Sequence, residues 1–248
     1  MYGGHRNGPG RRRGAINRAP TFFAHGGGGP NLIGMNLYRV AQCLVATFAR
    51  LFLRVRVTGV AHIPNERAVI VASNHASYFD IPLLGLALPR PANYLAKHEL
   101  LTVPLLGPLL RALGAIPVRR GRGDRGAIAE AVRRLALGQV VVIYPEGTRS
   151  KDGMLGSARP GIGMVVAQTG AAVVPVFIQG TRALRPFRRV TLAFGPPMTF
   201  EAQIGKQMDE PIGNPAGVRR GECYATIAEL VMNEITRLQR EEGRVVWK

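Results

Sequence analysis

Three short apolar runs rich in β-branched residues constrain the fold of this chain most strongly. They cover residues 68–72, 139–144 and 172–178, and each has the length of one strand. Runs that are apolar on both faces are typical of the buried strands of a parallel sheet. Helical patterns lie between them, which predicts an α/β fold with a mostly parallel central sheet flanked by helices.

Weaker patterns complete this arrangement. We expect further strands at residues 54–58, 93–96, 114–118 and 190–194, and helices at 32–53, 81–88, 124–138, in the segment ending at 169, and at 222–240. The chain has 248 residues, of which 46% are hydrophobic, enough for one large domain or two small ones. We favour a single α/β domain.

The first apolar run leads directly into Asn74 and His75, and Asp80 follows five residues later. A carboxylate about one turn beyond a histidine can hold one ring N–H and leave the other nitrogen as a base. This is the base half of a Ser-His-Asp triad, and the missing nucleophile can be a hydroxyl on a substrate. A core histidine beside a capping aspartate is the alternative interpretation.

The second apolar run ends in Pro145 and then in the segment Glu146–Ser150, which contains Gly147, Thr148 and Arg149. A rigid proline, a permissive glycine and an arginine at a strand end suit a ligand that carries phosphate. A plain turn between strand and loop is the alternative. Parallel strands end at one edge of a sheet, so we expect His75, Arg120 and Glu146 to lie together there.

The net charge of +18 is unevenly distributed, because nine arginines precede the first acidic residue, Glu66. Such a field favours an anionic partner, which can be a phospholipid surface, a nucleic acid or an acidic protein. A soluble protein with many arginines is the alternative. Residues 1–30 are rich in Gly and Arg and lack the apolar core of a signal peptide, so we expect a disordered basic tail. A wrongly chosen start codon upstream of Met35 would also explain that segment.

Residues 31–57 contain the longest apolar stretch. Arg39 and Arg50 lie inside it, and either charge would be costly in the middle of a bilayer. We therefore expect a helix that lies in the membrane interface, with an ordinary helix packed on the domain as the alternative. The run from Val103 to Leu110 is apolar but holds two prolines, which predicts an exposed apolar turn that dips into lipid.

One further motif suggests chemistry that we do not favour. Gly121–Gly126 fits the pattern GxGxxG, and Glu146 lies twenty residues later, as in a dinucleotide site. Arg119 and Arg120 separate the strand from the first glycine, so a flexible basic loop is the preferred interpretation. Cys43 and Cys223 are the only cysteines, which implies no disulfide framework and suggests a reducing compartment. No metal-ligand spacing is present, and we expect no metal site.

Taken together, four segments resemble the motifs of the glycerolipid acyltransferases, most closely the 1-acyl-glycerol-3-phosphate acyltransferases. They are the NHxxxxD motif at Asn74–Asp80, a GxIxxxR motif at Gly114–Arg120, the EGTRS motif at Glu146–Ser150 and an apolar strand around Pro175 at Val173–Ile178. The resemblance covers about residues 61–195. Arg119 stands where the family often has an acidic residue, and Arg159 stands where a lysine is common.

The resemblance implies acyl transfer from coenzyme A or acyl carrier protein to a lipid hydroxyl, here the sn-2 hydroxyl of 1-acyl-glycerol 3-phosphate. His75 and Asp80 would be catalytic. The acceptor phosphate would be bound by Arg120, Glu146, Gly147, Thr148 and Arg149. Other lysolipids, glycerol 3-phosphate or an aminolipid precursor are alternative acceptors, and a non-enzymatic basic module is the alternative of another class.

The same resemblance implies an acyltransferase domain at residues 58–248 that needs no cofactor. Its partners would be the lysophospholipid, the acyl thioester, the membrane surface and, where it is the donor carrier, acyl carrier protein, but no nucleic acid. We expect the protein to associate with the cytoplasmic face of the inner or plasma membrane.

Overall fold

A seven-stranded sheet forms the centre of the molecule. In a computed structural model, residues 32–119, 124–150, 152–183, 185–208 and 216–244 are described. The strands are β1 (Leu53–Thr58), β2 (Val69–Ser73), β3 (Ala92–Lys97), β4 (Ala115–Val118), β5 (Val140–Ile143), β6 (Ala172–Gln179) and β7 (Arg188–Phe194). They lie in the order β1-β7-β6-β2-β5-β3-β4. All neighbours are parallel except β6 and β7, which confirms the predicted mostly parallel sheet.

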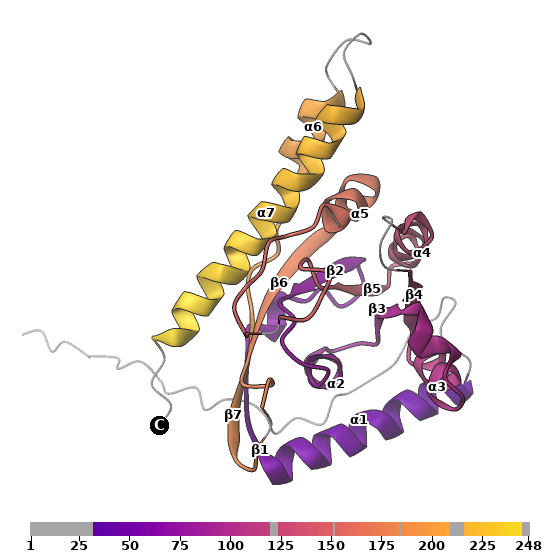
Figure 1. Cartoon of the computed structure of the whole chain (residues 1–248), viewed down its shortest axis with the longest axis vertical. Coiled ribbons are helices and arrows are strands. Elements are labelled where there is room, and N and C mark those ends of the chain that lie inside the picture. The colour runs from indigo at the N-terminus through magenta and orange to yellow at the C-terminus, as the bar shows by residue number, and fades with distance from the viewer. Residues whose placement is uncertain (1–31, 120–123, 151, 184, 209–215, 245–248) are drawn as a thin grey trace, which may run out of the picture.

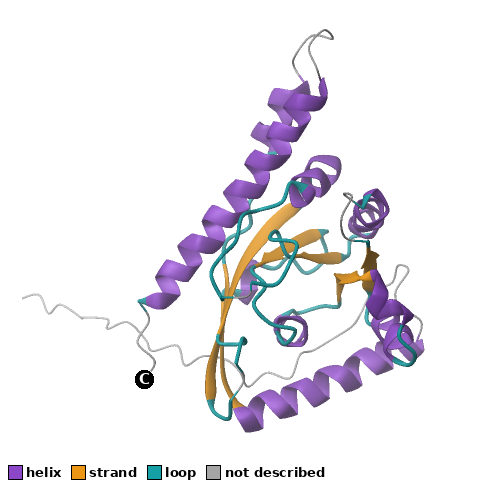
Figure 2. Ribbon diagram, viewed as in Figure 1, coloured by secondary structure: helices purple, strands orange, loops and turns teal. Residues whose placement is uncertain are grey.

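Helices cover both faces of this sheet (Figures 1 and 2). One face carries α4 (Arg125–Ala136), α5 (Gly161–Thr169) and α7 (Ala216–Gly243), and α6 (Glu201–Met208) packs beside α7. The other face carries α1 (Leu32–Phe52) and α2 (Asp80–Ala87), with α3 (Leu106–Ala112) near one end of α1. Two short 3-10 helices span Val60–His62 and His98–Thr102.

Alternate residues of each central strand enter different cores. Ile70 and Ala72 of β2 pack in the core under α4, α5 and α7, while Val69 and Val71 pack toward α1 and α2. The period of two in a strand explains this division. A strand that is buried on both sides reads as a continuous apolar run, which is why these strands could be predicted from the sequence.

One sequence expectation needs correction. The run from Val103 to Leu110 is only partly a turn, because α3 begins at Leu106 and contains Pro108. Pro108 occupies the first turn of α3, where a backbone N–H has no helical acceptor, so the proline does not prevent the helix. The exposed part of the prediction is confirmed at the turn itself, where Leu105 is 89% exposed.

The helix that precedes the sheet was predicted nearly to the residue. We expected residues 32–53, and α1 covers Leu32–Phe52. No helix in the described part of the chain combines the length and apolar character that crossing a bilayer requires.

Candidate active site

The carboxyl end of β2 places a hydrogen-bonded His-Asp pair at the edge of the sheet. His75 Nδ1 lies 3.0 Å from Asp80 Oδ2, and Asp80 is fully buried as the first residue of α2. The same carboxylate oxygen accepts hydrogen bonds from the backbone N–H groups of Ala76 and Ser77, each at 2.8 Å. Because a carboxylate oxygen only accepts, we assign the proton to Nδ1, which leaves Nε2 of His75 available as a base.

The imidazole is also held from its face. The ring of Tyr144 stacks on that of His75 with 4.1 Å between centroids and 20° between planes. Burial, and to a smaller extent the charge of Asp80, raise the pKa of the Tyr144 hydroxyl well above its usual value, so this hydroxyl stays protonated. The His75 side chain keeps only 9% of its surface exposed. Sequence analysis gave Tyr144 no role, because the contact joins two strands that are far apart in the chain.

Asn74 fixes the start of this segment to the neighbouring strand. Its side-chain Nδ2 donates to the Ile178 carbonyl at 2.9 Å, and its Oδ1 accepts from the Ile178 N–H at 2.7 Å. Both atoms of the amide are therefore used on the backbone of β6. The sequence analysis included Asn74 in the NHxxxxD motif but gave it no role. In the structure it anchors the backbone next to His75.

The segment after β5 lies directly against His75. Glu146 Oε1 accepts the His75 N–H at 3.2 Å, and Oε2 accepts the Gly156 N–H at 3.2 Å. The Ser150 N–H donates to the His75 carbonyl at 2.8 Å. Burial raises the pKa of Glu146, and the two backbone donors partly oppose that shift. This carboxylate therefore ties backbone segments together.

The remaining predicted residues of this loop face outward. Gly147, Thr148 and Arg149 are exposed. Gly147 has φ +69°, and an added Cβ would lie 2.7 Å from Arg159 Cδ, so a side chain fits poorly there. The Arg149 guanidinium lies 3.7 Å from the centre of the Tyr78 ring and donates to its hydroxyl at 3.0 Å. Tyr78 was not predicted, although it lies within the NHxxxxD segment.

The expected cluster of strand ends is only partly compact. β2 and β5 are neighbours, which brings His75 and Glu146 together as predicted. β4 lies three strands from β2 in the sheet, which is about 14 Å at ~4.8 Å per strand. Arg120 itself lies outside the described residues, as do Gly121 to Gly123 of the glycine-rich segment.

The helix after that segment begins as predicted. Asp124 Oδ1 accepts the N–H groups of Gly126 and Ala127 at 3.0 and 3.2 Å, which caps α4. The Arg119 N–H donates to Asp124 Oδ2 at 2.6 Å. This hydrogen bond, together with the two capping bonds, holds the pKa of Asp124 below its usual value.

Comparison with known proteins matches residues 54–179 to the Acyltransferase family. The chain is 33% identical over 138 residues to a chloroplastic 1-acyl-sn-glycerol-3-phosphate acyltransferase of Arabidopsis thaliana, covering 54% of this chain and 38% of the relative. It is 38% identical over 135 residues to a lyso-ornithine lipid O-acyltransferase of Pseudomonas aeruginosa, covering 54% and 50%. The chain thus spans at most half the length of these two curated relatives.

The fold is similar to a solved structure. The crystal structure of the 1-acyl-sn-glycerophosphate acyltransferase PlsC from Thermotoga maritima matches with a TM-score of 0.62 and 27% identity, covering 87% of this chain and 83% of that one.

Proposed function

The chain belongs to the acyltransferase family, and we propose that it transfers a fatty acyl group from an acyl thioester to the sn-2 hydroxyl of 1-acyl-glycerol 3-phosphate, giving phosphatidic acid. The hydrogen bond between His75 and Asp80 carries this proposal, because it leaves one imidazole nitrogen as a base beside the loop at residues 146–150. Relatives with this activity and the similarity to PlsC support the choice of reaction.

In the proposed mechanism, Nε2 of His75 removes the proton of the acceptor hydroxyl as its oxygen attacks the thioester carbonyl. Asp80 stabilises the imidazolium that forms. The tetrahedral intermediate collapses with loss of the thiolate, which takes the proton back from His75, so the enzyme is regenerated. General-base assistance of this kind contributes about 10²–10⁴ in rate.

Arg149 is the proposed anchor for the acceptor phosphate. Its guanidinium is exposed and has a fixed direction through Tyr78, and a guanidinium can bind phosphate oxygens in pairs. The Gly147 N–H already donates to the Tyr144 carbonyl at 2.9 Å, so Gly147 would contribute by letting the phosphate approach the loop closely. The Thr148 N–H would add a donor, and Arg120 would contribute from the β4 side. For Glu146 we propose an indirect part, since both of its carboxylate oxygens accept backbone N–H groups.

The acceptor reaches this site from a membrane, and we propose that α1 lies in the membrane interface. Val40, Leu44 and Leu51 are more than half exposed on one stripe of α1. The ring of Phe48 in the same stripe stacks on Phe79 at 6.5 Å, next to Tyr78 in the catalytic segment. The apolar face of α1 therefore continues to the site.

The remaining parts of the proposal concern the context of the reaction. The acyltransferase domain, predicted at residues 58–248, would also include β1 from Leu53, because this strand belongs to the sheet. It would follow the tail and the membrane helix and would work at the cytoplasmic face of the inner or plasma membrane. It would use acyl-CoA or acyl carrier protein as co-substrate without a cofactor or metal, and it would bind no nucleic acid.

A second acceptor has specific support. The lyso-ornithine lipid relative is 38% identical to this chain over 135 residues, and an aminolipid lacks the phosphate that Arg149 would bind. Assays of lysophosphatidic acid against lyso-ornithine lipid, each with acyl-CoA and acyl carrier protein donors, separate the two possibilities. A preference for the aminolipid would contradict the proposed acceptor.

The chemical step is tested with a radiolabelled acyl thioester. We expect the purified protein to form labelled phosphatidic acid and His75→Ala to form none, while circular dichroism and vesicle binding stay unchanged. Full activity of that variant would refute the mechanism.

A further inference from the structure

The connection between β6 and β7 forms an exposed surface next to the end of α1. Its apolar part is Phe187, which is 65% exposed, together with Leu51 at 62% and Phe52 at 45%. The cations around it are the exposed Arg50, Arg54, Arg185 and Arg188. We call these seven residues the β6–β7 surface.

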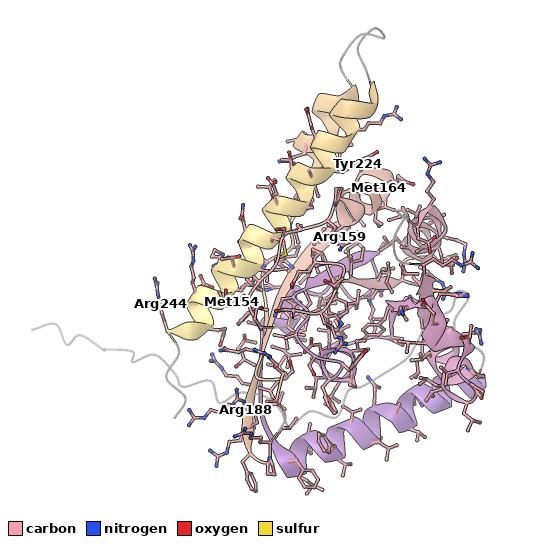
Figure 3. All side chains as sticks on the ribbon, viewed as in Figure 1. Met154, Arg159, Met164, Arg188, Tyr224 and Arg244 are labelled. Carbon is pink, nitrogen blue, oxygen red and sulfur yellow. The ribbon has the colours of Figure 1, made fainter. Side chains whose placement is uncertain are left out.

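The fold holds Phe187 at this place. Its N–H donates to the Phe52 carbonyl at 2.6 Å, and the next residue, Arg188, is paired with Leu53 in the parallel ladder of β7 and β1. Phe187 has φ +59°, a conformation that a bulky residue adopts only where its surroundings impose it. Figure 3 shows Arg188 at the end of the sheet where α1 ends. The aromatic ring is thus kept exposed by contacts of its own backbone.

Phe187 also extends an existing apolar row. The apolar stripe of α1 runs from Val40 to Phe52. The exposed apolar turn Val103–Leu106, which leads into α3, lies near the end of α1 that is farther from Phe187. Figure 1 shows α3 near one end of α1 and the turn between β6 and β7 at the other. A long row of exposed apolar side chains fits a bilayer better than a compact protein partner.

The charge around Phe187 is unbalanced. The sequence has no acidic residue before Glu66 and none from residue 180 to 200. No ion pair in the described parts of the chain involves Arg50, Arg54, Arg185 or Arg188. Four exposed guanidinium groups around three apolar side chains are complementary to anionic lipid headgroups above acyl chains.

We propose that the β6–β7 surface is a second membrane contact, selective for bilayers that contain anionic phospholipid. Phe187 inserts below the headgroups, and Arg185 and Arg188 bind lipid phosphates. The inference extends the membrane contact proposed for α1 and does not depend on acyl transfer. Together the two contacts fix the rotation of the molecule about α1, which turns the Phe79 side of the site toward the bilayer.

The test measures binding of the full chain to sedimented vesicles of phosphatidylcholine, with and without phosphatidylglycerol, in the absence of substrates. Each exposed arginine near a charged bilayer contributes about fivefold to affinity. The double variant Arg185→Gln/Arg188→Gln should therefore bind phosphatidylglycerol vesicles about 25-fold more weakly and neutral vesicles equally well. Phe187→Ser should weaken binding to both kinds of vesicle.

Matched controls lie on other surfaces. Arg220→Gln/Arg240→Gln removes the same charge from exposed positions on α7, and Leu137→Ser removes an apolar side chain that is 53% exposed at the end of α4. Thermal unfolding midpoints of all variants verify the fold. We expect both controls to bind like the unmodified protein.

Three outcomes would overturn the proposal. Equal losses in the arginine variant and its α7 control would show a general charge effect. Loss of binding in Leu44→Ser without any in Phe187→Ser would assign the contact to α1 alone. Unchanged vesicle binding with a higher KM for acyl carrier protein donors would make the surface a protein-docking site. Activity on detergent-dispersed lipid, measured in parallel, reports on the acyltransferase proposal separately.

Discussion

Asp80 shows how one buried atom can organise a site at the scale of single residues. Its Oδ2 accepts three hydrogen bonds, one from the imidazole of His75 and two from backbone N–H groups. The backbone bonds fix the carboxylate, and the carboxylate fixes the ring. The His-Asp spacing in the sequence predicted the hydrogen bond from the imidazole but contained no information on the two backbone bonds.

Replacing Asp80 by Asn tests the electrostatic part of this arrangement. The amide keeps the size of the side chain and one acceptor oxygen, but it carries no charge to stabilise an imidazolium. We expect kcat/KM to fall by about 10²–10⁴-fold. Since both residues act in one proton transfer, Asp80→Asn/His75→Ala should be no worse than His75→Ala alone. Additive losses would show that Asp80 acts independently of His75.

Arg149→Lys tests the proposed phosphate anchor. Lysine keeps the charge but loses the paired donors and the planar stack on Tyr78. We expect the KM for the phosphorylated acceptor to rise by about tenfold or more, since a hydrogen bond to a charged group contributes about 1.5–3 kcal/mol. The KM for the acyl donor should stay constant, and Tyr78→Phe should give a smaller change in the same direction. A change confined to the donor KM would contradict the anchor.

At the scale of elements, Glu146 joins three segments that are not continuous in sequence. It belongs to the loop after β5 and accepts N–H groups from the end of β2 and from Gly156, ahead of α5. Its position next to a motif glycine predicted a role in binding phosphate. In the structure only 7% of the Glu146 surface is exposed, and this burial and its backbone partners indicate a role in loop placement. Contacts between loops depend on the assembled sheet, so no local pattern reveals them.

The raised pKa of Glu146 gives this role a pH dependence. The folded protein binds the Glu146 proton more tightly than the unfolded chain does, so this group contributes less stability as pH rises from the usual carboxyl range through the folded pKa. Glu146→Gln removes that titration. It also places an amide donor toward one of the two backbone N–H groups, of His75 or of Gly156, which should cost about 1–3 kcal/mol.

Chemical denaturation of both proteins at several pH values measures the effect. We expect the stability difference between the original protein and Glu146→Gln to shrink as pH rises through this range. A difference that is constant with pH would show that Glu146 does not titrate there. Depressed carboxyl pKa values elsewhere, such as that of Glu130 at about 2, cancel in this comparison.

The strands of the sheet could be predicted from local sequence patterns, but their arrangement could not. Strands β2, β5 and β6 could be predicted because burial on both faces gives continuous apolar runs. Their order could not, and neither could the pairing of β1 with β7, in which Leu53 pairs with Arg188 from 135 positions later in the chain. The reason is that register depends on tertiary contacts. The short α3 was missed since a proline in the first turn resembles a proline that breaks a helix.

At the scale of the whole molecule, the position of α1 suggests how the chemistry is brought to its substrate. The apolar stripe of α1 lies outside the core, while Ala49 on its inner side packs beneath the sheet. The stacked pair of Phe48 and Phe79 joins the stripe to the segment that carries His75. A lipid acceptor would therefore travel a short distance from the bilayer surface to His75.

The double variant Val40→Ser/Leu44→Ser tests this arrangement. These side chains are 55% and 68% exposed, so their replacement should leave the unfolding midpoint unchanged. Burying one large aliphatic side chain contributes about 1.5–3 kcal/mol, and partial insertion of two should make the loss of vesicle affinity about tenfold or more. Turnover of acceptor presented in vesicles should fall accordingly, while turnover of detergent-dispersed acceptor should not. An equal fall in both assays would mean that the stripe packs against part of this protein or supports the site, and that the bilayer is not its partner.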